Sequence, residues 1–189
     1  MIQGKSIKLR IFKFDDLWNI ITLFQNAELM RFYARLPTTS LSELEAEFRE
    51  KLKNPDRLDL IVESRKDEVL GYAYLENISW KDRRAEMHIM MGNQQNDMVS
   101  YGVHASFLLL LFAFKSLNLH KVYAPAMAYA STIEKMVKKI GFKKEVTLKA
   151  LYYQQGQYWD FNIFGILKKE FNNLLRSNKG QKYLKYFCN

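Results

Sequence analysis

The segment from Ala85 to Met91 contains the side chains with the clearest potential for proton chemistry. Its residues alternate as those of a strand do, so Glu86, His88 and Met90 share one face. A carboxylate and an imidazole on one face can take up and release protons beside a reacting group. Two interpretations stay open: a catalytic and substrate-binding pair, or a polar pair that solvates one face of a strand.

The remaining reactive side chains show no arrangement typical of a metal centre or a nucleophile. His104 and His120 share no ligand spacing with each other or with Cys188. No nucleophile elbow precedes a helix, so a serine or cysteine nucleophile has no support. We therefore expect no metal site, and the single cysteine excludes a disulfide within the chain.

Composition indicates one domain without a membrane span. The 189 residues are 48% hydrophobic, enough for one sizeable core. The longest apolar stretch, Ala105 to Phe114, is shorter than the ~20 residues that cross a bilayer. The amino terminus lacks the continuous apolar core of a secretory signal, and the lone cysteine favours a reducing compartment, so we expect a cytoplasmic protein.

The net charge of +9 favours anionic partners, but the basic residues are scattered. Their blocks are short and are not interleaved with aromatic residues as a nucleic-acid platform requires. We expect nucleic-acid binding to be absent.

The elements that position Glu86 follow from periodicity and capping signals. Helices are predicted from Asp15–Asp16 through Leu23, around Leu29 to Tyr33, from Leu41 to Lys53 behind a Ser40/Glu43 capping box, and from Tyr101 to Leu117. A second capping box, Ser131/Glu134, predicts a helix that ends at Gly141. Alternation predicts strands over 7–11, 58–62, 69–75, 85–91, 120–124, 146–153 and 158–167.

The tail from Asn172 to Asn189 has apolar residues at helical spacing among lysines. It could dock on the body of the protein, on a second subunit or on a membrane surface. Docking on the body is the preferred interpretation because apolar residues at this spacing usually pack against protein.

Several landmarks along the chain resemble the GNAT superfamily of acetyltransferases. Gly71–Leu75 and Arg84–Ile89 resemble the meander of the ribosomal-protein and polyamine acetyltransferases, and Ala113–Tyr123 resembles the spermidine acetyltransferases. Lys139–Phe142 matches the Lys-x-Gly-Phe signature, and Gly156–Asp160 matches the closing Gly-x-Tyr-x-Asp.

The resemblance implies an α+β fold with three layers (α/β/α), in which a mixed, mostly antiparallel sheet forms the middle layer. It covers nearly the whole chain before the tail, so we expect a GNAT domain at 1–171 and a basic, aromatic tail at 172–189. Dimers are common in this fold, which makes a homodimer possible by analogy.

The resemblance also implies acetyl-CoA as cofactor, with its pyrophosphate at the amino terminus of the central helix. The positions that correspond to the cofactor loop and the neighbouring strand are Ile89, Met90, Met91, Val99, Ser100, Tyr101, Gly102 and Val103. Asp97 stands where the family has a neutral or basic residue, and Met98 also departs from the pattern of this loop. A carboxylate near a polyanion weakens binding, unless it points away.

For catalysis, the resemblance implies direct attack of an amine on the thioester, polarised by a backbone N–H near Met90 or Met91. Glu86 is the candidate general base, directly or through water. Where the family has an Asn, a Ser or Ala, and a Tyr that protonates the departing thiolate, this chain has Ala130, Ile133 and Val137. Tyr129 and Ser131 are close in sequence and are the candidate substitutes.

His88 and Asp160 are candidates to contact the acceptor, although Asp160 could equally tie the last strands together. The acceptor could be a protein amino terminus, an amino sugar or another small amine. Arg35–Leu36–Pro37 and the positive net charge argue against a polyamine. The alternative function is a catalytically silent GNAT module that binds a ligand or partner through the same cleft.

Overall fold

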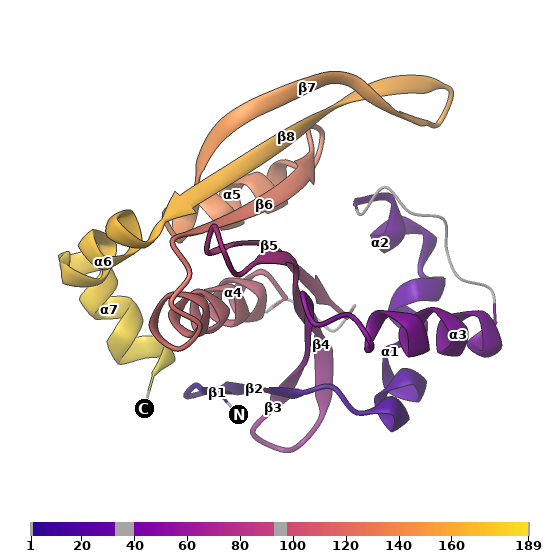
Figure 1. Cartoon of the computed structure of the whole chain (residues 1–189), viewed down its shortest axis with the longest axis horizontal. Coiled ribbons are helices and arrows are strands. Elements are labelled where there is room, and N and C mark those ends of the chain that lie inside the picture. Colours follow the sequence, from indigo (N-terminus) through magenta and orange to yellow (C-terminus); the bar gives the residue numbers. More distant parts are fainter. Residues whose placement is uncertain (1, 33–39, 93–97, 189) are drawn as a thin grey trace.

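A computed structural model describes residues 2–32, 40–92 and 98–188 of the chain (Figure 1). Its strands are β1 (Ile2–Gln3), β2 (Ile7–Ile11), β3 (Leu58–Ser64), β4 (Val69–Ser79), β5 (Arg84–Met91), β6 (Lys121–Met127), β7 (Lys143–Gln154) and β8 (Gln157–Leu167). They form one sheet in the order β1-β2-β3-β4-β5-β6-β8-β7. Within it, β5 and β6 run parallel and the other neighbours run antiparallel.

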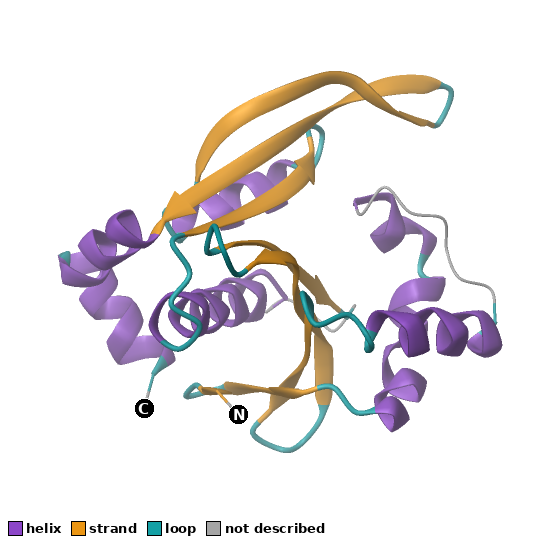
Figure 2. Ribbon diagram, in the orientation of Figure 1, coloured by secondary structure: helices purple, strands orange, loops and turns teal. Residues whose placement is uncertain are grey.

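Helices cover both faces of this sheet (Figure 2). They are the 3₁₀ turn η1 (Phe14–Asp16) and the α-helices α1 (Leu17–Gln25), α2 (Ala27–Phe32), α3 (Leu41–Lys51), α4 (Met98–Lys115), α5 (Ser131–Lys139), α6 (Lys168–Arg176) and α7 (Asn178–Phe187). The three-layer α+β architecture with a mixed, mostly antiparallel sheet is the one the sequence predicts. In the described part of the chain, none of the helices is both long and apolar enough to span a bilayer.

Of the two capping boxes predicted from the sequence, one is present in the structure and the other is not. The Ser40/Glu43 capping box is present: the Glu43 backbone N–H donates to Ser40 Oγ at 3.2 Å, and the Ser40 N–H donates to the Glu43 carboxylate at 3.3 Å. The Ser131/Glu134 box was wrong, because Ala130 is the N-cap and the Glu134 N–H donates to its carbonyl. Ser131 is therefore the first helical residue, and the Glu134 carboxylate instead pairs with Lys138 at 2.6 Å.

Two apolar clusters, one on each face of the sheet, hold the layers together. The larger lies beneath α4 and α5 and extends to Phe171 and Phe187 of α6 and α7. The smaller lies beneath α1, α2 and α3 and includes Tyr72 and Met90. Alternate residues of β5 therefore face opposite clusters, as its alternating sequence predicts.

The centre of the sheet is split between β5 and β6. The two strands pair only at Arg84↔Lys121, Ala85↔Val122 and Glu86↔Tyr123. β5 continues to Met91 along β4, whereas β6 continues to Met127 along β8. The strands thus separate beyond Glu86, and α4 starts seven residues after β5 ends.

The carboxyl-terminal tail docks on the body of the protein. Phe187 of α7 is 8% exposed, and its ring stacks on His104 of α4 at 4.4 Å. The His104 Nε2 atom lies 2.9 Å from the Phe187 carbonyl oxygen. The predicted boundary between residues 171 and 172 falls inside α6.

Truncating this anchor should destabilise the fold. We expect Phe187→Ala to lower the free energy of unfolding by about 3 kcal/mol, because it removes a buried ring and leaves a cavity. Urea unfolding monitored by circular dichroism measures the change. The neighbouring Tyr186 is 75% exposed, so Tyr186→Ala is the matched control and should change stability by less than about 0.5 kcal/mol. Equal losses in both variants would contradict the docked tail.

Candidate active site

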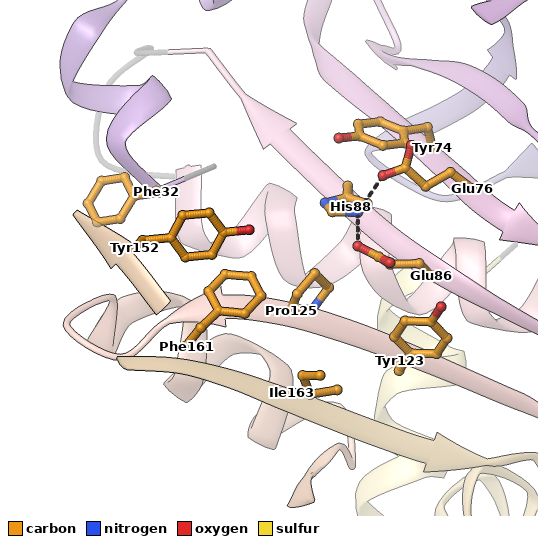
Figure 3. Close-up of a pocket in the computed structure, with 10 residues that line it drawn as sticks. All are labelled: Phe32, Tyr74, Glu76, Glu86, His88, Tyr123, Pro125, Tyr152, Phe161 and Ile163. Carbon is orange, nitrogen blue, oxygen red and sulfur yellow. Dashed lines mark hydrogen bonds and ion pairs between the residues drawn. The ribbon is translucent and has the colours of Figure 1, made fainter. Parts of the chain in front are cut away.

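A cavity of about 360 Å³ opens on the face of the sheet that α1, α2 and α3 cover (Figure 3). We call it the acidic cavity because two carboxylates line it among aromatic rings. Its lining residues come from α2 and five strands: Phe32, Tyr74, Glu76, Glu86, His88, Tyr123, Pro125, Tyr152, Phe161 and Ile163.

Three polar groups converge in this cavity. His88 Nε2 lies 2.7 Å from Glu86 Oε1 and 3.1 Å from Glu76 Oε1. Asn77 donates from Nδ2 to the second oxygen of Glu86 at 3.3 Å. The ring of Tyr74 stacks on His88 with centroids 4.5 Å apart. The imidazole is thus fixed between two carboxylates and against an aromatic face.

The charges of this cluster depend on one another. Burial alone would lower the pKa of His88, but its contacts with Glu76 and Glu86 raise that pKa above its usual value. Burial opposes ionisation of Glu76 as well, yet His88 and Arg57 lower its pKa. The two carboxylate contacts therefore favour the protonated form of the imidazole that lies between them.

Glu76 was not among the site residues predicted from the sequence, although the pairing of β4 with β5 would have indicated it. In the β4–β5 pair Glu76 lies directly opposite Glu86, and Tyr74 lies directly opposite His88. Like charges at directly opposed positions are destabilising unless a cation lies between them. Pairing the two strands across the turn at 80–83 would have brought both acids and the imidazole together.

Nε2 of His88 and one oxygen from each of Glu76 and Glu86 lie within 4.8 Å of one another, close enough to hold a metal ion. The sequence predicted no metal site, and this group was not foreseen. His88 Nε2 already contacts both carboxylates, and Glu76 also pairs with Arg57.

A second, narrow cavity of about 40 Å³ lies where β5 and β6 separate, beneath α4 and α5. We call it the apolar cavity, after the side chains that line it: Phe32, Met87, His88, Ile89, Ser106, Ala124, Pro125, Ile133, Met136 and Val137. It shares Phe32, His88 and Pro125 with the acidic cavity. The two cavities therefore approach each other from opposite faces of the sheet at the strand split.

The predicted cofactor residues differ in whether they line the apolar cavity. Ile89 lines it, whereas Met90 and Met91 line neither cavity. Gly102 lies close by: a Cβ there would be 3.0 Å from Met136 Sδ and 3.6 Å from Met91 Cγ. Its lack of a side chain lets α4 approach α5 and β5.

The start of α4 carries the other predicted cofactor residues. Ser100 is exposed, Tyr101 is half-buried and Val103 is buried in the larger cluster. The Val99 side chain is not described, and Asp97 lies outside the described residues, as does 35–37.

Tyr129 lines neither cavity. Its hydroxyl lies 2.9 Å from both the Arg31 carbonyl oxygen and Gln154 Oε1, which joins the end of α2 to the β7–β8 hairpin. Ser131 is exposed at the first residue of α5 and also lines neither cavity. Ile133 and Val137 occupy positions at which the GNAT family has a Ser or Ala and a Tyr. Both line the apolar cavity. A proton-donating role for Tyr129 or Ser131 stays a prediction.

Asp160 acts within the hairpin. Its Oδ1 accepts from the Ala150 N–H at 2.9 Å, where β7 departs from regular pairing and Ala150 has a positive φ of 48°. The contact supports the interpretation that Asp160 ties the last strands together. His88, the other residue predicted to contact the acceptor, lines both cavities.

The protonation of His88 can be checked directly, because the chain has three histidines. We expect an NMR pH titration to give His88 a pKa above the ordinary value of about 6.5. The ion pairs then stabilise the fold fully below that ordinary value, and the stabilisation is lost as pH rises through the raised one. Buried His104 is the internal control, since burial lowers its pKa. A His88 pKa equal to or below that of His104 would contradict this description.

Comparisons with known proteins bear on the family and the fold of this chain. The family described as "Acetyltransferase (GNAT) domain" matches residues 6–143. Spermidine N(1)-acetyltransferase of Vibrio cholerae is 24% identical over 173 residues, covering 90% of this chain and 98% of that protein. The Escherichia coli K12 protein of the same name is 27% identical over 158 residues, covering 84% of each chain.

Among solved structures, the fold resembles spermidine N-acetyltransferase from Vibrio cholerae in complex with CoA and spermine. The TM-score is 0.81 at 24% identity, and the match covers 89% of this chain and 99% of that one. At this identity the likeness shows a shared fold.

Proposed function

This chain belongs to the GNAT acetyltransferase family and is an acetyltransferase, and we propose that it moves an acetyl group from acetyl-CoA to a small primary amine of the polyamine class. One observation supports the proposal above the others. The acidic and apolar cavities meet at His88 and Pro125, so an amine and a thioester can approach each other there from opposite faces of the sheet.

The apolar cavity, at about 40 Å³, would receive the acetyl end of acetyl-CoA. Its walls, including Ile89, Ala124 and Met136, suit a slender chain that must exclude water from the thioester. The absent side chain of Gly102 keeps the start of α4 close to this cavity, where the helix presents backbone N–H groups suited to phosphate. When bound, acetyl-CoA supplies an acetyl group already activated as a thioester.

The acidic cavity prepares the amine. A substrate ammonium would bind beside Glu86 and Glu76, between aromatic walls such as Tyr152 and Phe161. Glu86 accepts its proton, directly or through a water molecule, which leaves the nitrogen lone pair free to attack. A new C–N bond would form as the C–S bond breaks, the nitrogen would release its second proton, and the departing thiolate would take up a proton to give the free thiol. The residues thus act by positioning and proton transfer, without a covalent enzyme intermediate.

The acceptor class follows from local charge and from the relatives. The chain is basic overall, which argued against a polyamine, but the acidic cavity places two carboxylates beside the proposed reaction point. Two curated relatives bear the name spermidine N(1)-acetyltransferase. Aromatic walls also suit the alkyl stretches between the amines. The silent-module alternative has no support in the family match.

A thiol-release assay with three acceptors tests this proposal. We expect spermidine to be acetylated at least about 10-fold more efficiently than butylamine, because its additional ammonium groups gain from Glu76 and Glu86. A short peptide with a free amino terminus should be slower still, because it is too bulky for a cavity of about 360 Å³. Turnover of the peptide alone would overturn the acceptor class, and no turnover with any amine would overturn the proposed function.

A further inference from the structure

A buried arginine lies behind the acidic cavity without lining it. Arg57 precedes β3, and its side chain is only 4% exposed. Its Nε lies 2.9 and 3.1 Å from the two oxygens of Asp59, and its Nη2 lies 3.0 Å from Tyr72 Oη. Its Nη1 forms a short ion pair with the outer oxygen of Glu76. All three guanidinium nitrogens are therefore engaged.

This guanidinium reaches His88 along two routes. Through charge, Arg57 holds Oε2 of Glu76, while Oε1 of the same carboxylate contacts His88. Through packing, the guanidinium carbon lies 4.2 Å from the centre of the Tyr74 ring, which itself stacks on His88. Each partner of His88 on β4 is thus fixed by the same side chain.

We propose that Arg57 is a positioning residue for acetyl transfer: by fixing the Glu76 carboxylate and the Tyr74 ring, it holds His88, and through His88 the Glu86 carboxylate, where the two cavities meet. This inference rests on the proposed function, because Glu86 is the base of that reaction. Arg57 touches neither substrate in this account.

The chemistry of the contacts requires arginine. Only a planar guanidinium offers one N–H to both oxygens of Asp59, a separate N–H to Glu76 and a flat face to Tyr74 at the same time. A lysine keeps the charge but presents a single ammonium point. Arg57→Lys therefore keeps the buried charge balance and removes the geometry.

The chain offers a matched control. Arg10 of β2 also binds carboxylates: each of its two Nη atoms lies 2.7 Å from an oxygen of Asp16, and its Nε lies 2.9 Å from Glu63. Like Arg57, it joins two carboxylates. Arg10 lines neither cavity and contacts no residue of the Glu76–His88–Glu86 cluster in the described part of the chain. Arg10→Lys therefore loses guanidinium–carboxylate contacts away from the site.

Two measurements separate positioning from a purely structural role. Arg57→Lys should lower kcat by about 10-fold or more and leave the KM for acetyl-CoA within about 2-fold, since small misplacements of reacting groups cost rate. Arg10→Lys should leave kcat within about 2-fold of wild type. In NMR spectra, Arg57→Lys should shift the His88 ring signals and leave those of His120 unchanged, whereas Arg10→Lys should shift neither.

The outcomes distinguish the two claims. An inactive wild-type protein would overturn the proposed function, and the NMR comparison would still test whether Arg57 holds His88. An active wild type in which both lysine variants lose equal rate, or in which the His88 signals of Arg57→Lys stay unchanged, would overturn the positioning role. Should Arg57→Lys fail to fold, Tyr74→Leu tests the packing route: a kcat and His88 signals equal to wild type would contradict the inference.

Discussion

Replacing Glu86 with glutamine should lower the rate of amine acetylation by about 10²- to 10³-fold, the range expected when a positioned general base is removed. Glutamine keeps the size and hydrogen-bonding reach of the side chain but cannot accept the ammonium proton. Glu86 is the carboxylate closer to His88, at 2.7 Å, and it lines the acidic cavity. The measurement is thiol release under saturating acetyl-CoA and spermidine.

Two comparisons make the Glu86→Gln result specific. Acetyl-CoA affinity, measured by calorimetry, should stay within about 2-fold of wild type, because Glu86 does not line the apolar cavity. Glu50→Gln changes a carboxylate on α3 that is 75% exposed and pairs with Lys53, so it should leave the rate unchanged. A Glu86→Gln enzyme with at least half the wild-type rate would remove Glu86 from the mechanism.

Filling the apolar cavity should abolish acetyl-CoA binding. Ala124 lines this cavity from β6 and is 5% exposed, so the larger ring of an Ala124→Phe variant would occupy the space proposed for the acyl arm. We expect affinity to fall by at least about 100-fold, equivalent to about 2.7 kcal/mol. Calorimetric titration measures the loss, and circular dichroism confirms that the variant is folded.

Overpacking itself costs about 1–3 kcal/mol of stability, so the control variant must also place a phenylalanine in the packed core. Ala126 lies two residues further along β6, belongs to the same apolar cluster and is 2% exposed, but it lines neither cavity. Ala126→Phe should therefore lose stability and retain cofactor binding. If Ala124→Phe binds acetyl-CoA as well as Ala126→Phe does, the acyl arm lies elsewhere.

The order of elements was predictable because each carries its own local signal. The all-round apolar pattern of α4 reflects burial between the sheet and α7, and the Ser40/Glu43 box marks the true start of α3. Glycine at 141 has a φ of 102°, as its place after α5 requires. Boundaries were less exact, because strand pairing lengthens β4 to Ser79 beyond its apolar core.

Two of the three residues of the Glu76–His88–Glu86 cluster were visible in the sequence. Glu86 and His88 share a strand, so period-two alternation alone placed them together. Glu76 depends on the pairing register of β4 with β5, which spans a turn of several residues. The role of Arg57 depends on a tertiary contact, because this residue precedes β3 and its side chain pairs with Glu76 of β4. Such contacts between segments leave no periodic trace in a single sequence.

The positive net charge argued against a polyamine acceptor because it takes no account of where the charges lie in the fold. A surplus of +9 describes the whole surface, and it says little about one cavity where Glu76 and Glu86 converge. Local geometry decides which charges a bound ligand meets, since exposed charges farther than about 10 Å are largely screened at ordinary ionic strength.

The central claim is that the split between β5 and β6 receives acetyl-CoA beside an acceptor amine. Calorimetric titration of the wild-type chain with acetyl-CoA, followed by addition of spermidine to the same sample, tests it most directly. We predict saturable binding with one molecule per chain, then release of free thiol when the amine is added. No detectable binding at millimolar acetyl-CoA would contradict the account.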